Sequence, residues 1–375
     1  MDTKNVIIVG GGLAGLTAAI HLSLRGFPVT VIEKNEYPKH KVCGEYVSNE
    51  VLPYLGSLGI NPAGSGAVPI SKLLFSDTGQ HQLETQLPLG GFGISRFTLD
   101  LLLYKEAVRN GCSVIHQTVT DISFTDEKFH VSLAGGEQLS ADIVLGAFGK
   151  KSKIDISLAR KFTSRPSPWL AVKSHYWGEW PSDTVGLHSF NGGYCGVSKV
   201  EDDRINVCYL ADYNSFKKHK NITDYQTTVL SKNQFLRNVF KWDPIFDAPL
   251  AISQISFERK LAVEHHMLMI GDTAGLIHPL CGNGMAMAIH SAKIASELTE
   301  SFLTSEITRV EMESRYSAAY SSAFSSRLTM GRMLAGTLRN TLASNLIFKS
   351  AIRFPALLTK IIEKTHGNLI PAISK

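Results

Sequence analysis

The first residues whose spacing suits a chemical task are glycines near the N-terminus. Gly10, Gly12 and Gly15 form the pattern G-x-G-x-x-G, between an apolar run at residues 5–9 and apolar residues at helical spacing. Gly10 permits a tight turn, Gly12 lets a pyrophosphate approach the backbone N–H groups at the start of the helix, and Gly15 lets the helix pack on the strand. The pattern therefore predicts a dinucleotide-binding turn.

A carboxylate at the end of the next apolar run strengthens this prediction. Glu33 follows Val29–Ile32 and stands 18 residues after Gly15, where it would accept hydrogen bonds from the ribose hydroxyls of an adenosine. The same negative charge disfavours a 2′-phosphate, so we expect FAD or NAD rather than NADP. Glycines also occur in ordinary turns between a strand and a helix, and Glu33 with the flanking apolar runs favours the nucleotide site.

A second glycine-containing segment lies far along the chain. The residues MIGDTAG at 269–275 follow an apolar run, and PLCGNGM at 279–285 opens a helix rich in small residues. Gly271 and Asp272 resemble the GD box of the para-hydroxybenzoate-hydroxylase-like flavoproteins, a superfamily of flavin monooxygenases, flavin halogenases and geranylgeranyl reductases. The resemblance implies that Asp272 binds ribityl or ribose hydroxyls of FAD. The alternative is an aspartate that follows a strand and only caps the N-terminus of the next helix.

The resemblance extends to two further parts of the FAD site. The turn at 282–285 is implied to direct the positive end of a helix at the flavin N1 and O2 atoms, where negative charge develops on reduction. Arg96, in the pattern R-x-x-L-D-x-x-L at 96–103, is similar to the family's arginine helix and is implied to lie beside the flavin or its phosphates. The predicted cofactor-binding residues are Gly10, Gly12, Leu13, Ala14, Gly15, Glu33, Lys34, Arg96, Gly271, Asp272, Gly282, Asn283, Gly284 and Met285.

One segment departs from the family's pattern. Residues 146–149 read GAFG, where the aromatic hydroxylases of this superfamily usually carry GADG. In those enzymes the aspartate supports both FAD and the productive encounter with NAD(P)H, and here Phe148 takes its place. We expect FAD as the cofactor and NAD(P)H as the external electron donor, and Phe148 weakens the second expectation.

Three residues are candidates for contact with the substrate or the reacting part of the flavin. Cys43 and Glu45 lie in the segment KVCGE after the second strand, which resembles the K-x-C-G of geranylgeranyl reductases and the G-E-S of halogenases. Tyr194 matches only the tyrosine of the reductases' Y-x-W-x-F-P segment, and the halogenase W-x-W-x-I-P box is absent. A buried structural cysteine, a solvated glutamate and an ordinary strand aromatic are the alternatives.

Strands and helices must position these residues in an α/β fold. We predict a Rossmann-like FAD-binding lobe of the GR2 type, formed by residues 1–68, 95–155 and 258–300. Residues 69–94 and 156–257 have strand-like alternation and are predicted to form an inserted antiparallel β substrate lobe. Residues 301–375 are predicted to be a helical C-terminal region.

Composition excludes several classes of protein. The net charge of +5 on 375 residues does not indicate a nucleic-acid partner, and the histidines and the five scattered cysteines have no metal-ligand spacing. No signal peptide or membrane-spanning run is recognised, so we expect a cytoplasmic protein. Its basic C-terminal helices either contact the inner face of the membrane or present solvated basic faces. The sequence predicts no oligomeric state.

The resemblance implies an FAD-dependent oxidoreductase. The leading hypothesis is a monooxygenase in which reduced flavin and O₂ hydroxylate an aromatic, quinone-like or polyketide-like lipophilic substrate. The alternatives are a geranylgeranyl-reductase-like ene-reductase acting on a prenyl or lipid-like substrate, and a non-catalytic flavin-binding scaffold.

Overall fold

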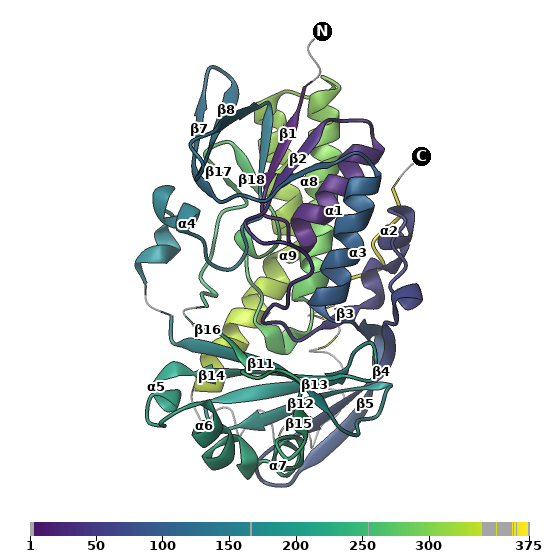
Figure 1. The fold of residues 1–375 in the computed structure, drawn as a ribbon, viewed down its shortest axis with the longest axis vertical. Coiled ribbons are helices and arrows are strands. Elements are labelled where there is room, and N and C mark those ends of the chain that lie inside the picture. The colour runs from purple at the N-terminus through teal and green to yellow at the C-terminus, as the bar shows by residue number, and fades with distance from the viewer. Residues whose placement is uncertain are drawn as a thin grey trace.

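The glycine motif lies at the carboxyl end of a central strand of a six-stranded sheet, in the upper lobe of the molecule (Figure 1). The computed structural model describes residues 4–165, 167–253, 255–339, 350, 362, 364 and 366–373. In sheet order the strands are β17 (Val263–Glu264), β18 (Met267–Met269), β10 (Ile143–Gly146), β1 (Val6–Val9), β2 (Val29–Ile32) and β6 (Ser113–Ile115). Strands β18, β10, β1, β2 and β6 are parallel, so their carboxyl ends meet at the same edge.

Three helices pack together in this lobe. Helix α1 (Leu13–Leu24) begins directly after β1 and packs against α3 (Arg96–Arg109) and α8 (Gly284–Leu303). The four residues of β1 are all buried, as expected for a central parallel strand that is covered on both faces. A small antiparallel sheet of β7 (Val119–Thr125), β8 (Lys128–Leu133) and β9 (Gln138–Ala141) completes the lobe.

A nine-stranded sheet forms the second lobe. In sheet order its strands are β15 (Asp243–Pro244), β11 (Trp169–Trp177), β14 (Ile205–Asp212), β13 (Gly193–Lys199), β12 (Thr184–Phe190), β4 (Val68–Ser76), β5 (Gln82–Gly93) and β3 (Tyr46–Ser48), and β16 (Leu250–Ser253) also pairs with β11. The stretch 69–94 contributes most of β4 and β5 to this sheet. The sheet is not wholly antiparallel, because β4 and β12 pair in parallel.

The structure differs from the predicted lobe boundary at residue 68. Strand β3 lies in the large sheet, paired with β5, although the sequence assigned its residues to the cofactor-binding lobe. The pairing brings Tyr46 opposite Gly93, and its ring lies over Gly91, where a Cβ would stand 2.5 Å from the ring. A strand of three residues is too short to show the alternation of apolar and polar residues by which strands are recognised in a sequence.

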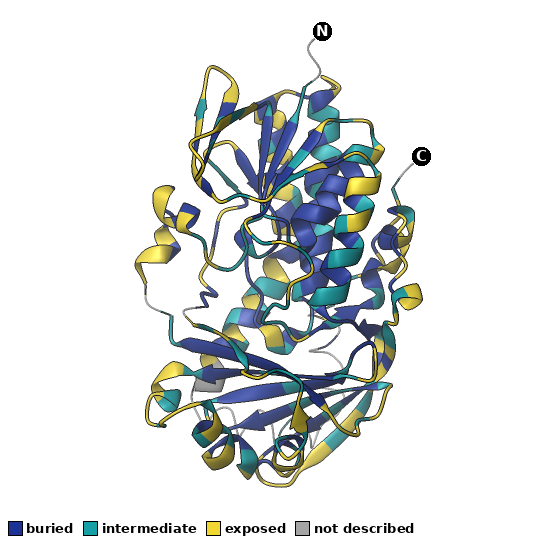
Figure 2. Cartoon of the chain, in the orientation of Figure 1, coloured by how far each residue is buried: buried dark blue, intermediate teal, exposed yellow. Residues whose placement is uncertain are grey.

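The two faces of the large sheet have different partners. Helices α6 (Ile222–Thr228) and α7 (Gln234–Val239) cover the outer face, where Tyr225 and Leu236 pack with Cys195. The inner face carries Tyr194 and Leu210 and faces the cofactor lobe, where Leu276 packs against it. Figure 2 shows the strands buried between these layers. Successive residues of β13 thus point to opposite faces, so Tyr194 points inward and Cys195 points outward.

The C-terminal part of the chain spans both lobes. Helix α9 (Arg309–Arg339) runs from the upper lobe to the large sheet (Figure 1), and the tail returns to the cofactor lobe, where the N–H of Ile370 donates to the backbone oxygen of Glu50. No helix among the described residues is long and apolar enough to cross a membrane. Several basic residues of the C-terminal region predicted to contact the membrane or solvent, including Lys349, Arg353 and Lys360, lie outside the described residues. Arg327, in the same region, pairs internally, with its Nη1 3.2 Å from Glu50 Oε1.

Candidate active site

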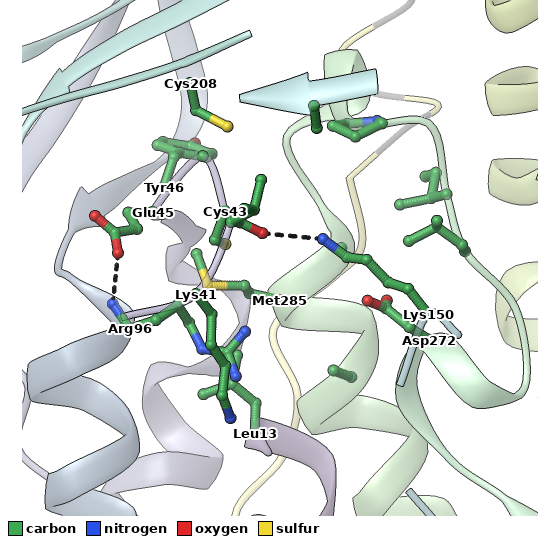
Figure 3. Close-up of a pocket in the computed structure, with 18 of the residues that line it drawn as sticks. Leu13, Lys41, Cys43, Glu45, Tyr46, Arg96, Lys150, Cys208, Asp272 and Met285 are labelled. Carbon is green, nitrogen blue, oxygen red and sulfur yellow. Dashed lines mark hydrogen bonds between the residues drawn. The ribbon is translucent and has the colours of Figure 1, made fainter. Parts of the chain in front are cut away.

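A cavity of about 860 Å³ lies between the two lobes (Figure 3). One border of the cavity is formed at the carboxyl ends of the strands of the six-stranded sheet, with Gly10, Gly12 and Glu33. Its opposite border is the inner face of the large sheet, with Tyr194 and Leu210. Every predicted site residue except Gly15 lines this one cavity.

The glycine turn is built as the spacing predicts. Gly10 has a φ of +109°, and a Cβ there would stand 2.3 Å from the oxygen of Ala147. A Cβ on Gly15 would stand 1.9 Å from the oxygen of Gly10, so only glycine lets α1 approach β1 this closely. No side chain caps the start of α1, and its first N–H groups are therefore available to an anion at the cavity.

Glu33 is held in a fixed orientation beside this turn. Its Oε2 accepts the N–H of Gly11 at 2.9 Å, and its Oε1 accepts the N–H of Asn35 at 3.0 Å. Each carboxylate oxygen keeps lone-pair capacity for a further donor. Glu33 and Lys34 both line the cavity, which suits recognition of ribose hydroxyls.

The GD turn is supported from behind by two buried cations that the sequence did not reveal. Lys260 Nζ donates to the backbone oxygen of Asp272 at 2.8 Å, and Arg160 Nη1 donates to that of Thr273 at 3.0 Å. Arg160 is paired in turn with Asp155 at 2.9 Å. Burial lowers the pKa of Lys260 to about 8. These cations fix the turn so that the Asp272 side chain is left to border the cavity.

The start of α8 provides a second open helix end. Gly282 has a φ of +64° and no side chain caps the helix that follows. Asn283 and Met285 line the cavity, and Arg327 Nη1 donates to Asn283 Oδ1 at 2.9 Å. The first N–H groups of α8 thus face the same space as those of α1.

The residues present fit FAD. Two helix N-termini without side-chain caps suit the pyrophosphate and the pyrimidine edge of the flavin, and two carboxylates suit the ribose and ribityl hydroxyls. By this assignment α1 would hold the pyrophosphate, Glu33 the ribose, Asp272 the ribityl chain, and the turn before α8 the flavin. No group of three or more potential metal ligands occurs among the described residues.

Arg96 lies near the glycine turn, with Nη2 3.7 Å from the position of a Cβ on Gly12. Its guanidinium binds the buried Asp100 through Nε at 2.7 Å and Nη2 at 2.9 Å. Lys41 Nζ lies 2.8 Å from the same carboxylate. Asp100 therefore orients two cations beside the place expected for the phosphates.

Glu45 joins the loop after β2 to the large sheet through a buried ionic network. Its carboxylate accepts Lys173 Nζ at 2.5 Å, His175 Nε2 at 2.7 Å and the N–H of Arg96 at 2.8 Å. Burial alone would raise the pKa of Glu45, but the Lys173 charge and the His175 hydrogen bond outweigh it and hold the pKa below its ordinary value. Both oxygens are occupied, which suits a positioning role better than proton transfer to a substrate.

Sequence reasoning missed Lys173 and His175, although their spacing in the sequence could have indicated a buried ionic pair. They stand two residues apart in the apolar strand β11, so both point to the same face, and charged residues are rarely buried there without a partner. The partner, Glu45, has a φ of +54° and lies more than 120 residues away in sequence, so no local pattern could identify it.

Cys43 and Tyr194 line the cavity, as does Cys208 on the neighbouring strand β14. Asn206 Nδ2 holds the Cys43 loop by donating to the backbone oxygen of Gly44 at 2.8 Å. All five cysteines are free thiols, and burial raises the pKa of Cys208 to about 12. Burial also raises the pKa of Tyr194 well above its ordinary value, so its phenol stays protonated and can donate a hydrogen bond.

Comparison with known proteins identifies the class to which this site belongs. The family described as "FAD binding domain" matches residues 3–302, and the chain therefore belongs to that family of flavoproteins. The resemblance noted in the GD box and the predicted α/β fold are thereby confirmed.

Individual relatives are distant. The chain is 23% identical to a tryptophan 2-halogenase of Chondromyces crocatus (82% of this chain, 63% of the relative) and 25% identical to digeranylgeranylglycerophospholipid reductase 1 of Methanothermobacter thermautotrophicus (78% and 76%). A menaquinone reductase of Mycobacterium tuberculosis is 23% identical over 94% of this chain and 90% of the relative. The chain thus spans less than two thirds of the halogenase.

Solved structures share the fold. The flavin-dependent halogenase CmlS superposes with a TM-score of 0.76 at 21% identity, over 88% of this chain and 64% of that chain. PqsL of Pseudomonas aeruginosa, described as a probable FAD-dependent monooxygenase, superposes with a TM-score of 0.74 at 15% identity, over 92% of this chain and 99% of that chain.

Replacing either carboxylate at the FAD site should weaken cofactor binding. Glu33→Ala and Asp272→Ala each remove a charged acceptor, which costs about 1.5–3 kcal/mol, or roughly a 10- to 100-fold weaker Kd. FAD fluorescence titration of the apoprotein measures this, with the exposed Glu36→Ala as the control. Wild-type Kd values in both variants would mean that the two carboxylates do not contact FAD.

Removing Lys173 should destabilise the protein. Lys173→Met leaves the buried carboxylate of Glu45 with an incomplete set of donors, at a cost of about 3–5 kcal/mol of unfolding free energy. Urea unfolding measures the loss, and Lys72→Met, at the exposed pair with Asp183, is the control with a change below about 1 kcal/mol.

The same pair predicts the direction of a pH effect. Because the folded-state pKa of Glu45 lies below its ordinary value, the stability it contributes is present above that ordinary value and is lost as pH falls through the folded-state pKa. In Lys173→Met the loss should begin at higher pH than in the wild type. Identical acid-unfolding profiles for the two proteins would contradict this account of the network.

Proposed function

We propose that the protein is an FAD-dependent monooxygenase that hydroxylates an aromatic, quinone-like or polyketide-like lipophilic substrate. The observation that carries the proposal is one continuous cavity that reaches from the cofactor-binding turns to an apolar wall of the large sheet. In the reaction one atom of O₂ enters a C–H bond of the substrate and the other leaves as water. Two electrons come from NAD(P)H through FAD.

The wall of the cavity supports a lipophilic substrate. It is contributed by several strands and by the segment before α8, and it includes Leu73, Phe75, Leu87, Val185, Leu187 and Ile255. Apolar side chains exclude water, which protects a reduced flavin and O₂ from unproductive reaction. Tyr194, a protonated phenol on this wall, is the group we propose to orient a substrate oxygen by hydrogen bonding.

The missing halogenase W-x-W-x-I-P box favours a monooxygenase over a halogenase. Chain length does not separate the two classes, since the structural likeness covers 99% of PqsL and 93% of the brominase Bmp2.

A flavin-dependent ene-reductase is the second candidate, favoured by the position of Cys43. The K-x-C-G segment borders the cavity, and Asn206 holds its backbone in place. Two relatives named as reductases align over most of their lengths. The same cavity would then take a prenyl or lipid-like substrate. A flavin-binding scaffold without catalysis is the third candidate, favoured only by Phe148.

The proposed site of action is cytoplasmic, with contact between the basic C-terminal region and the membrane as an additional proposal. Exposed Met333 beside Arg332 on α9 supports it, whereas Arg327 is engaged internally. The proposed donor is NAD(P)H, although Phe148 replaces the aspartate that supports it in related hydroxylases.

An oxygen-dependence experiment separates the candidate reactions. Dithionite-reduced holoprotein is mixed with phenolic, quinone and prenyl lipids, with and without isotopically labelled O₂, and products are analysed by mass spectrometry. A monooxygenase should form product only with O₂ and incorporate one labelled oxygen atom. Product formed without O₂ would overturn the monooxygenase and support the reductase. Flavin that is neither reduced by NAD(P)H nor coupled to any product would support the scaffold.

A further inference from the structure

Lys150 crosses between two loops that border the cofactor site. It follows the segment GAFG, and the neighbouring Gly149 N–H donates to Thr273 Oγ1 at 2.7 Å, which ties this loop to the GD turn. From there Lys150 Nζ donates to the backbone oxygen of Val42 at 3.1 Å, in the loop that carries Cys43. Figure 3 shows this side chain reaching across the cavity above Asp272.

The charge of Lys150 has no carboxylate partner among the residues that the structure describes. Its one hydrogen bond in that part of the chain goes to a neutral carbonyl, although an ammonium group has three donors. By contrast, Arg96 and Lys41, which also line the cavity, share the carboxylate of Asp100. Lys150 is partly buried, so an unpaired charge there is unfavourable unless an anion enters the cavity.

The carboxylates at the cavity do not supply that anion. Glu45 is occupied by Lys173 and His175, and Glu33 contacts Gly11 and Asn35 rather than Lys150. Asp272 forms no ion pair with Lys150. The aspartate that the family usually places at position 148 would add a carboxylate two residues away on this loop, and Phe148 adds none. The loop is therefore more positive than the family pattern implies.

The ammonium group also faces the part of the cavity that contains the thiols. Burial raises the pKa of Cys208 to about 12, and the positive charge of Lys150 acts in the opposite direction, which places the two groups within electrostatic reach. A molecule bound between Asp272 and the Cys43 loop would therefore lie beside Lys150.

We propose that Lys150 contacts the flavin of bound FAD and supplies a positive charge that stabilises its reduced form. A flavin ring acquires negative charge on reduction, and a fixed cation nearby favours that state. The inference rests on the assignment of the cavity to FAD. It does not depend on whether the reaction is a hydroxylation or a reduction.

Sulfite binding to oxidised holoprotein tests the charge directly, because the sulfite adduct places negative charge on the flavin and requires neither substrate nor O₂. In Lys150→Met the sulfite Kd should rise at least about tenfold. The midpoint potential should fall with it, by about 30 mV for each tenfold change of a two-electron couple. The sulfite Kd of Lys150→Arg should stay within about threefold of the wild-type value. The exposed Lys153→Met, the control, should have the wild-type sulfite Kd.

Lys150→Gln separates the charge from the hydrogen bond, since its amide can still donate to the Val42 oxygen. It should show the same weakened sulfite binding as Lys150→Met while retaining FAD. Wild-type sulfite affinity and potential in Lys150→Gln would overturn the proposal and reduce Lys150 to a link between loops. If the methionine variant loses FAD, the glutamine and arginine variants still decide between these outcomes, and a failed FAD assignment would appear separately as wild-type protein without bound flavin.

Discussion

The buried ionic network of Glu45 is the interaction on which the arrangement of the two lobes depends. Lys173 and His175 are fully buried on a strand of the large sheet, and each would be unfavourable there without a carboxylate. Glu45 meets both and also accepts the first N–H of α3, so one side chain connects the cofactor loop, the sheet and the arginine helix. This connection holds the Cys43 loop against the sheet, because moving the loop away would leave the buried charges of Glu45 and Lys173 unpaired.

Positive electrostatic character then organises the cofactor half of the cavity. The open ends of α1 and α8 direct N–H groups toward it, and the cations Arg96, Lys41 and Lys150 lie around the same space. Asp100 orients the side chains of Arg96 and Lys41, and its single negative charge does not neutralise both cations. The substrate half is apolar by contrast, so the cavity combines an anion-binding end with a water-excluding end. FAD would span such a boundary well, since its phosphates are charged and the dimethylbenzene end of its flavin ring is apolar.

The cofactor half could be predicted from the sequence because its determinants are local. Gly15 is required by a contact within one strand-turn-helix unit, Gly10 is favoured by its own positive φ, and the Asp272 box is read from adjacent residues. The supporting cations could not be predicted in the same way. Lys260 and Arg160 reach the GD turn from other segments, and Lys173 meets Glu45 across 128 positions, so their partners exist only in the folded chain. The short strand β3 was also missed, because three residues carry no period.

This division between local and tertiary determinants explains why the class of chemistry is better defined than the substrate. The residues proposed to hold FAD are specified by motifs that must keep their spacing, and a change in Gly10 or Gly15 alters the turn itself. The wall of the substrate half comes from strands β4, β5, β12 and β13, whose inner residues need only be apolar and of suitable size. Different substrates can be accommodated there without a change in the fold. Tyr194 is a polar residue on that wall, so in the proposed reaction its phenol would select which part of a lipophilic substrate faces the flavin.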